Sequence, residues 1–400
     1  MNDFTIQCGN LPGKPPEPVF APPPDVPTRE AVNGVRFDFN RGLRVKFPLG
    51  KTYRCAFRDL DTGCLLYSMD VPPGSTVESV KKYFIRFGLE VYDGEALVFS
   101  HELDLSGKPV LIRFPVGALG DTIAWFSFVE RFQRKHDCEV FCSMEPRLGN
   151  LFRDQYPDIA FINKEEAAKL NPYATYNLGL FFNGDTDHQP FDFRQVGLHR
   201  TAGYILGTDL SDEPPRVDLS AERKIKEKYV VIAAQASSQC KYWNHPSGWR
   251  EVVAHLKSQG YRVLCIDRMP EYGTDFVWNR IPYGAEDFTG DLPLQERIDL
   301  IKGCDLFVGL SSGLSWLAWC CRVPVVLISG FTDPMNEFAT PYRVHNPTVC
   351  HGCWNDMRCD FDHFDFFWCP RKKENRDKFE CTKMITPKMV IGKIREALCR

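Results

Sequence analysis

The chain has 400 residues, more than the roughly 250–300 at which a single hydrophobic core stops growing, so two or three domains are expected. A formal net charge of -3 supplies no basic field, which argues against nucleic acid and anionic lipid as partners. The sequence has no uninterrupted run of about 18 apolar residues and no N-terminal secretory signal, so a cytoplasmic protein without a membrane span is expected.

The first hundred residues change from proline-rich to strand-forming sequence. Residues 1–34 contain LPGKPPEPVFAPPPDVP and are predicted to be a disordered proline-rich arm, because proline cannot continue a helix or a central strand. Short segments of alternating polarity follow, among them VRFDFN, TYRCAFRDL and ALVFSHEL. They predict a small all-β domain over residues 35–108, either a barrel or a sandwich.

From Pro109 the sequence alternates between strand and helix patterns. The segment PVLIRF predicts a buried strand, VGALGD a glycine loop and TIAWFSFVERFQRK a helix, and the alternation predicts a Rossmann-like domain over residues 109–218. A second such domain is predicted over residues 219–345, which contain the strands YVVIAAQ and VPVVLIS. Two parallel sheets that bind ligands at the carboxyl ends of their strands are the layout of nucleotide-sugar transferases.

Asp121 stands at the start of the first predicted helix of the α/β region, directly after the glycine loop. Gly117 and Gly120 allow a tight turn there and leave space for a substrate beside the carboxylate. Aspartate also caps helices that have no catalytic role. The spacing is therefore compatible with both a substrate-facing carboxylate and a plain helix cap.

A second candidate site lies in GLSSGL, between a predicted strand and a predicted helix. The backbone N–H groups and hydroxyls of residues 309–314 are expected to point outwards at the positive end of the helix dipole. A pyrophosphate is the natural ligand of such a helix end. A glycine turn that closes the strand without binding a ligand is the alternative.

Sixteen cysteines need an explanation in a protein that is expected in a reducing compartment. Eleven of them are scattered and are interpreted as small buried hydrophobic residues. Four of the other five have the spacing C-x₂-C-x₁₅-C-x₁₁-C, formed by Cys350, Cys353, Cys369 and Cys381. This pattern predicts a four-thiolate zinc or iron site in a finger over residues 346–385, followed by a C-terminal helix over residues 386–400.

Cys359 is the fifth cysteine of the cluster. It could replace Cys369 as a ligand or remain a free thiol, and the spacing leaves both possibilities open. Four cysteines fill a tetrahedral site and leave no open position, so the metal is expected to be structural and no catalytic metal is expected. Buried cysteines without a metal are the alternative, but Asp360 and Asp362 make the segment polar for a plain core.

The order of these motifs resembles that of the ADP-heptose glycosyltransferases over roughly residues 109–340. The resemblance rests on the GD pair at a helix start, on KYW after a strand, on DLFVGLSSGLSWLA and on the later TDP. It implies a GT-B-like pair of Rossmann-type domains, with the acceptor domain first and the ADP-heptose donor domain second. With the β-domain in front and the cysteine-rich finger behind, the whole chain resembles the bacterial autotransporter heptosyltransferases.

The resemblance also implies a reaction and partners. Members of that family transfer heptose from ADP-heptose to serine hydroxyls of an autotransporter adhesin in the cytosol, with inversion at the anomeric carbon. They assemble into large homo-oligomers, often dodecamers, around a bound iron. Iron is thus implied for the cysteine site, with zinc as the alternative.

Residue roles follow from matching positions within the motifs. Asp121 matches the catalytic base, Lys241 matches a lysine that binds the donor phosphates, and Asp267 stands where an acid would contact the adenosine ribose. The full set of implied donor-binding residues is Gly120, Thr122, Lys241, Asp267, Ser311, Ser312 and Gly313.

The donor motif departs from the family pattern D-T-G-x-x-H. This chain has SSGLSW from Ser311 to Trp316, and so lacks both the acid and the histidine. This departure motivates a non-catalytic metal-binding scaffold on a transferase fold as an alternative function. A lipopolysaccharide-type heptosyltransferase is the alternative within enzymes.

Several further residues have two interpretations. Trp243 could line the sugar site or pack between domains, and Trp316 could stack on the donor base or pack within its domain. Arg268 and Arg280 could bind phosphate or be solvated surface residues. The loop NGDTDHQ could hold a metal or be a plain polar loop.

Overall fold

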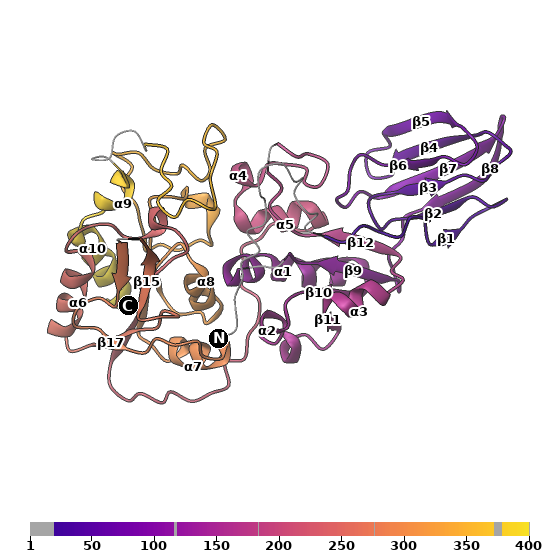
Figure 1. Cartoon of the computed structure of the whole chain (residues 1–400). Coiled ribbons are helices and arrows are strands. Elements are labelled where there is room, and N and C mark those ends of the chain that lie inside the picture. Colours follow the sequence, from indigo (N-terminus) through magenta and orange to yellow (C-terminus); the bar gives the residue numbers. More distant parts are fainter. Residues whose placement is uncertain (1–19, 116–117, 183, 276, 372–377, 400) are drawn as a thin grey trace. The chain divides into compact units, whose positions relative to one another are not determined.

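The computed structural model describes residues 20–115, 118–182, 184–275, 277–371 and 378–399 (Figure 1). The described chain divides into two compact units. The first contains residues 20–115 and 125–211, and the second contains residues 118–124 and 212–399. Gly117, the loop glycine predicted to leave space beside the candidate base, lies outside the described residues.

The first unit begins with two antiparallel four-stranded sheets, in agreement with the predicted β-domain. Their strand orders are β1-β2-β3-β6 and β5-β4-β7-β8. Alternating side chains of the central strands, such as Cys55 and Leu89, are buried, whereas much of β5 and β8 at the edges is exposed. The strands are β1 (Arg29–Glu30), β2 (Arg36–Asp38), β3 (Arg44–Lys46), β4 (Tyr53–Asp59), β5 (Leu65–Val71), β6 (Thr76–Glu78), β7 (Phe87–Asp93) and β8 (Ala96–Glu102).

Strand β1 corrects the prediction that residues 1–34 are a disordered arm. It pairs with β2, so this end of the arm belongs to a sheet. Before it, Arg44 Nη1 donates to the carbonyl of Pro24 at 2.9 Å and Arg36 Nε donates to the carbonyl of Pro27 at 2.8 Å. Proline keeps its carbonyl acceptor although it lacks an N–H donor, and arginines of the adjacent strands use these acceptors. Residues 1–19 lie outside the described part of the chain.

The rest of the first unit is an α/β layer with a parallel sheet in the order β11-β10-β9-β12. The short apolar strands are buried by helices on the chain connections between them, as expected for βαβ units. Strand β9 is central and ends just before the glycine loop. The elements are β9 (Pro109–Arg113), α1 (Leu119–His136, whose residues up to 124 belong to the second unit), β10 (Glu139–Ser143), α2 (Pro146–Gly149), η1 (Arg153–Gln155), β11 (Ile159–Ile162), α3 (Lys164–Lys169), β12 (Ala174–Asn177), α4 (Phe193–Val196) and α5 (Leu198–Leu206).

The second unit is built on a six-stranded parallel sheet in the order β17-β14-β13-β18-β19-β20. Every residue of β13, β18 and β19 is buried, which explains why these strands read as unbroken apolar runs. The strands are β13 (Tyr229–Ala233), β14 (Arg262–Cys265), β17 (Glu286–Asp287), β18 (Leu306–Leu310), β19 (Val325–Ile328) and β20 (Arg343–Val344).

Helices cover this sheet, and α6 and α10 lie side by side (Figure 1). Val390, Ile394 and Ala397 of α10 belong to the buried core of the unit. None of the described helices is long and apolar enough to cross a membrane. The helical elements are η2 (Gln239–Lys241), α6 (Gly248–Ser258), α7 (Leu294–Lys302), α8 (Gly313–Cys320), η3 (Pro334–Asn336), α9 (Glu380–Lys383) and α10 (Pro387–Leu398).

An antiparallel hairpin, which the sequence patterns do not predict, interrupts this alternation. Strands β15 (Glu271–Thr274) and β16 (Val277–Arg280) pair with each other between β14 and β17. Arg280 forms an ion pair with Glu271 at 3.2 Å across the hairpin, and both side chains are exposed. The geometry therefore agrees with the surface interpretation of Arg280.

Candidate active site

The loop after β18 presents the start of α8 with an unsatisfied hydroxyl. Ser312 is the N-cap residue in an extended conformation, and its side chain makes no capping hydrogen bond. Among the described residues, no group hydrogen-bonds the buried Oγ of Ser312. A buried hydroxyl without a partner is rare in proteins, and it lies here where the helix dipole and free N–H groups favour an anion.

The first turn of α1 packs directly against this end of α8, within the second unit. A Cβ atom on Gly313 would lie 2.9 Å from Cβ of Leu119 and 3.1 Å from the backbone N of Gly120. A Cβ atom on Gly120 would lie 3.1 Å from Cδ1 of Trp316. Both glycines are therefore needed for the N-terminal ends of two helices to converge on one place.

Asp121 lies in the first turn of α1, at this convergence. Its carboxyl group is half-buried, and burial raises its pKa to about 6, opposed by the positive charge of Lys241. The neighbouring Thr122 is only 2% exposed, so the structure gives it a packing role. Asp121, Lys241, Ser312 and Gly313, which are far apart in the sequence, thus fall within one region of the fold.

Lys241 ends the short η2 helix that follows β13. Its Nζ lies 3.4 Å from Oγ of Ser237 and 5.9 Å from the ring centroid of Phe331. Within the described part of the chain, the ammonium group forms no ion pair with a carboxylate. A half-buried ammonium group that is not engaged by a carboxylate of the described chain can bind an anionic group of a ligand.

The predicted ribose contact at Asp267 is not supported by the geometry. Its side chain is 2% exposed, and its two carboxylate oxygens accept hydrogen bonds from the backbone N–H groups of Ala234 at 2.9 Å and Gln235 at 3.1 Å. Burial raises the pKa of this carboxyl, while those hydrogen bonds act in the opposite direction. Asp267 therefore fastens the ends of β13 and β14 to each other.

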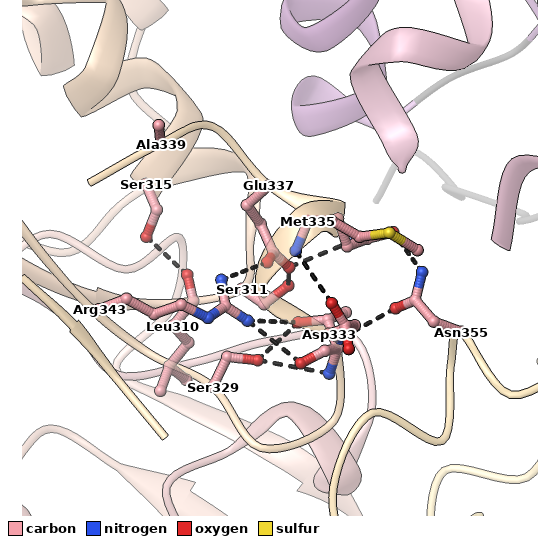
Figure 2. A network of polar contacts seen from close by, with 12 residues as sticks. Leu310, Ser311, Ser315, Ser329, Asp333, Met335, Glu337, Ala339, Arg343 and Asn355 are labelled. Carbon is pink, nitrogen blue, oxygen red and sulfur yellow. Dashed lines mark hydrogen bonds and ion pairs between the residues drawn. The ribbon is translucent and has the colours of Figure 1, made fainter. Parts of the chain in front are cut away.

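Ser311 is part of a buried polar network that the sequence did not reveal (Figure 2). Its Oγ donates to Oε1 of Glu337 at 2.5 Å, and Oε2 of Glu337 accepts from Nη1 of Arg343 at 2.6 Å. Arg343 also donates to the carbonyl of Thr332 at 3.1 Å. Ser311 thus ties the loop before α8 to the segment after β19, and its hydroxyl is already used.

Replacement of Glu337 by glutamine is expected to lower the free energy of unfolding by about 3 kcal/mol, because it leaves the buried Arg343 guanidinium without its counter-charge. The side chains of Arg343 and Glu337 are 9% and 1% exposed. Glu271→Gln is the matched control, since its pair with Arg280 is solvated and is expected to contribute at most about 0.5 kcal/mol. Urea unfolding of the three proteins measures both changes. Equal stability of Glu337→Gln and the control would contradict the account.

The TDP segment joins the cysteine-rich region to the same network. Asp333 caps η3 by accepting from the backbone N of Met335 at 3.1 Å, and its own N–H donates to Oδ1 of Asn355 at 2.9 Å. Two backbone hydrogen bonds extend this contact: Gly352 N to Gly330 O at 2.9 Å and Trp354 N to Phe331 O at 3.1 Å. The beginning of the finger is therefore held against the loop after β19.

Described residues farther along the finger pack in a small apolar cluster that is separate from the main core. Cys240, Phe331, Trp368, Cys369 and Phe379 form its buried part. A Cβ atom on Gly330 would lie 2.6 Å from the carbonyl oxygen of Cys381, so only glycine fits between the loop and α9. This packing explains how a segment with little regular structure keeps a defined position.

The four predicted metal ligands lie near one another, but they do not form a completed site. A hydrogen bond from the Cys381 thiol lowers the pKa of Cys350 to about 6, against the effect of burial. The pKa of Cys353 is raised by burial and by the neighbouring Cys240, Cys369 and Cys359. Across the described residues, no three His, Cys, Asp or Glu side chains form a group that could hold a metal ion. The predicted metal-bound finger is therefore not shown, although four adjacent thiols suit iron or zinc chemically.

The structure also shows the surroundings of further residues that have two interpretations. Trp316 is 3% exposed and packs against Phe338, with ring centroids 5.0 Å apart, which supports a packing role. Trp243 is 4% exposed and its Nε1 donates to the carbonyl of Ile385 at 2.8 Å. In the polar loop, Nδ1 of His188 lies 2.8 Å from Oδ2 of Asp185, in a local turn.

Comparison with known proteins agrees with this architecture in both units. Residues 32–95 match the family model of the glycosyltransferase TibC N-terminal domain, and residues 205–360 match that of glycosyltransferase family 9 (heptosyltransferase). The crystal structure of the iron-containing dodecameric glycosyltransferase TibC from enterotoxigenic E. coli H10407 superposes with a TM-score of 0.91. TibC is 51% identical in sequence to this chain, and the match covers 94% of this chain and 99% of the TibC chain. TibC has also been crystallised in complex with ADP-D-beta-D-heptose.

Two curated relatives extend over nearly the same length. The autotransporter heptosyltransferase Aah of Escherichia coli is 53% identical over 378 residues, which are 94% of this chain and 96% of Aah. BimC of Burkholderia thailandensis is 41% identical over 94% of this chain and 89% of its own length, and it is described as an inactive autotransporter heptosyltransferase. The chain therefore has the GT-B-like fold of these transferases and belongs to the autotransporter heptosyltransferase family.

Proposed function

We propose that this protein transfers heptose from ADP-heptose to serine hydroxyls of an autotransporter adhesin in the cytoplasm, with inversion at the anomeric carbon. Family membership and the ADP-heptose complex of TibC support the donor. The observation that carries the proposal is the convergence of Asp121, Lys241 and the unsatisfied Ser312 hydroxyl at the ends of two helices. A base, a cation and a phosphate-binding helix end are the groups that an inverting sugar transfer needs.

In this mechanism Asp121 accepts the proton of the acceptor serine as the serine oxygen attacks the anomeric carbon. The bond to the β-phosphate oxygen breaks on the opposite side, and ADP leaves. A carboxylate with a pKa of about 6 is ionised near neutral pH and is more basic than an ordinary aspartate. Lys241, Ser312 and the N-terminus of α8 stabilise the charge that develops on the leaving diphosphate.

Ser312→Ala tests the phosphate site and is expected to weaken ADP binding about fivefold, since a net hydrogen bond contributes about 1 kcal/mol. Isothermal titration with ADP measures the change. Ser315→Ala is the control, because the hydroxyl of Ser315 already donates to the carbonyl of Leu310 at 2.6 Å. Loss of the Ser315 hydroxyl is expected to lower the free energy of unfolding and to leave ADP affinity unchanged. Unaltered ADP binding by Ser312→Ala would remove this residue from the proposed site.

We further propose that Cys350, Cys353, Cys369 and Cys381 hold a structural iron, with zinc as the alternative. The iron content of TibC and the proximity of the four thiols support this assignment. Bound there, the metal would link the two halves of the finger and so stabilise residues 346–385. By the same similarity to TibC, a large homo-oligomer, in particular a dodecamer, is proposed for this chain.

A non-catalytic scaffold is the competing function, and two observations favour it. The relative BimC is described as inactive, and the donor motif of this chain lacks the acid and the histidine of the family pattern. Incubation of the purified protein with ADP-heptose and a serine-containing adhesin fragment separates the two functions. The proposed transferase releases ADP only when the fragment is present, whereas a scaffold releases none. ADP release that requires a lipopolysaccharide acceptor instead would favour the lipopolysaccharide-type alternative.

A further inference from the structure

The loop that carries Lys241 is attached to the cysteine-rich finger. The backbone N of Gln239 donates to the carbonyl of Phe366 at 2.9 Å, and Oγ of Ser238 donates to the same oxygen at 3.0 Å. Cys240, the residue just before Lys241, is buried in the apolar cluster together with Cys369 of the finger. The residues that immediately precede Lys241 are therefore fixed by residues that follow position 365.

A pair of amide side chains closes the loop on its other side. Nε2 of Gln239 donates to Oδ1 of Asn244 at 2.7 Å. The two N–H groups of Asn244 are shared among three oxygens: the carbonyls of Gln239 and Tyr242, each at 3.0 Å, and Oγ1 of Thr382 at 2.8 Å. Gln239 and Asn244 thus bracket Lys241 in a closed ring of hydrogen bonds.

Thr382 makes this ring part of the finger. It follows Cys381 directly in α9, and its side chain is 1% exposed. The contact between Asn244 and Thr382 spans 138 positions of the sequence. The hydrogen bond from Asn244 to Thr382 therefore joins α9 directly to the loop of Lys241.

We propose that Asn244 and Thr382 are positioning residues through which the folded finger holds Lys241 in place for the donor diphosphate. The inference rests on the proposed role of Lys241. A lysine ammonium is a point charge on a flexible stem, so its contribution to phosphate binding depends on where the loop holds its backbone. The finger then sets donor affinity in addition to stabilising its own segment.

Thr382→Val removes the hydroxyl with little change of shape and is expected to weaken ADP binding about fivefold, the equivalent of one net hydrogen bond. The measurement is isothermal titration of the full-length protein with ADP, with thermal unfolding run in parallel. Thr382→Ser keeps the hydroxyl and is expected to restore wild-type affinity. Thr348→Val is the control, because that exposed threonine lies near the start of the finger and its hydroxyl donates to Oδ1 of Asn346 at 2.7 Å, away from the loop of Lys241.

A double-mutant cycle with Lys241→Ala separates positioning from a general loss of stability. If Thr382 acts through Lys241, Thr382→Val causes no further loss of ADP affinity once the lysine is absent. An equal loss in both backgrounds would overturn the inference, and so would wild-type affinity in Thr382→Val. If Lys241→Ala itself binds ADP normally, the proposed role of Lys241 fails, and this outcome is distinct from the other two.

Discussion

Asp121→Asn is expected to lower the turnover number for heptose transfer by about 10²–10⁴-fold while ADP binding stays within about twofold, because a general base acts in the chemical step. The amide has nearly the shape of the carboxylate but cannot accept the serine proton. Asp137→Asn is the matched control. Asp137 is exposed just beyond the other end of α1, and its φ of 47° suits asparagine as well as aspartate.

The pH dependence of the reaction gives this prediction a second readout. The pKa of Asp121 is raised to about 6 by burial, so the base is ionised above that pH and protonated below it. The rate is therefore expected to fall by about half when the pH reaches 6, and by about tenfold per pH unit well below it. Asp121→Asn should lose this acid limb. An acid limb that persists unchanged in Asp121→Asn would assign the base to another residue.

If the four cysteines hold the proposed iron, Cys369→Ser is expected to remove most of it and to lower the unfolding temperature by about 10 °C, because metal binding contributes folding free energy to a segment with little regular structure. Cys369 is 6% exposed and packs with Cys240, Trp368 and Phe379. Metal analysis of the purified protein by mass spectrometry, together with thermal unfolding, measures both effects. The same analysis distinguishes iron from zinc.

Cys359→Ser is the control for that experiment and also tests the alternative ligand. Cys359 is half-buried at the edge of the same cluster, and a free thiol at this position predicts unchanged iron content. Cys64, exposed in the β-domain, provides a second control that lies outside the finger. If Cys369→Ser keeps its iron and Cys359→Ser loses it, then Cys359 is the metal ligand and Cys369 is the free thiol.

The sequence predicted the architecture because its signals are local. Unbroken apolar runs gave the buried strands β13, β18 and β19, and the glycines before α1 and α8 marked the two helix ends where Asp121 and Ser312 lie. The convergence of these two positions with Lys241 followed from resemblance to a family. It could not follow from spacing, since residues 121, 241 and 312 have no periodic relation.

The features that were missed or wrong depend on contacts between distant residues. Glu337 and Arg343 are ordinary charged residues in the sequence, and only the fold buries them together. In the sequence, an acidic residue after a strand is compatible with a ribose contact and also with a buried carboxylate that accepts backbone hydrogen bonds. In the structure, the Asp267 carboxylate accepts hydrogen bonds from two backbone N–H groups. Two amide side chains, Gln239 and Asn244, flank Lys241 in the sequence and weakly indicate a hydrogen-bonded loop. The contribution of Thr382 could not be predicted from any local pattern, because it lies 138 positions away from Asn244.

The central claim is that this chain transfers heptose to serine, and the intact mass of an adhesin fragment after incubation tests it most directly. The purified protein is mixed with ADP-heptose and the fragment, in parallel with Asp121→Asn and with a fragment whose serines are replaced by alanine. The account predicts that the fragment mass increases by one or more heptose units only when the wild-type enzyme acts on the serine-containing fragment. An unchanged fragment mass in that reaction, or equal modification by Asp121→Asn, would contradict it.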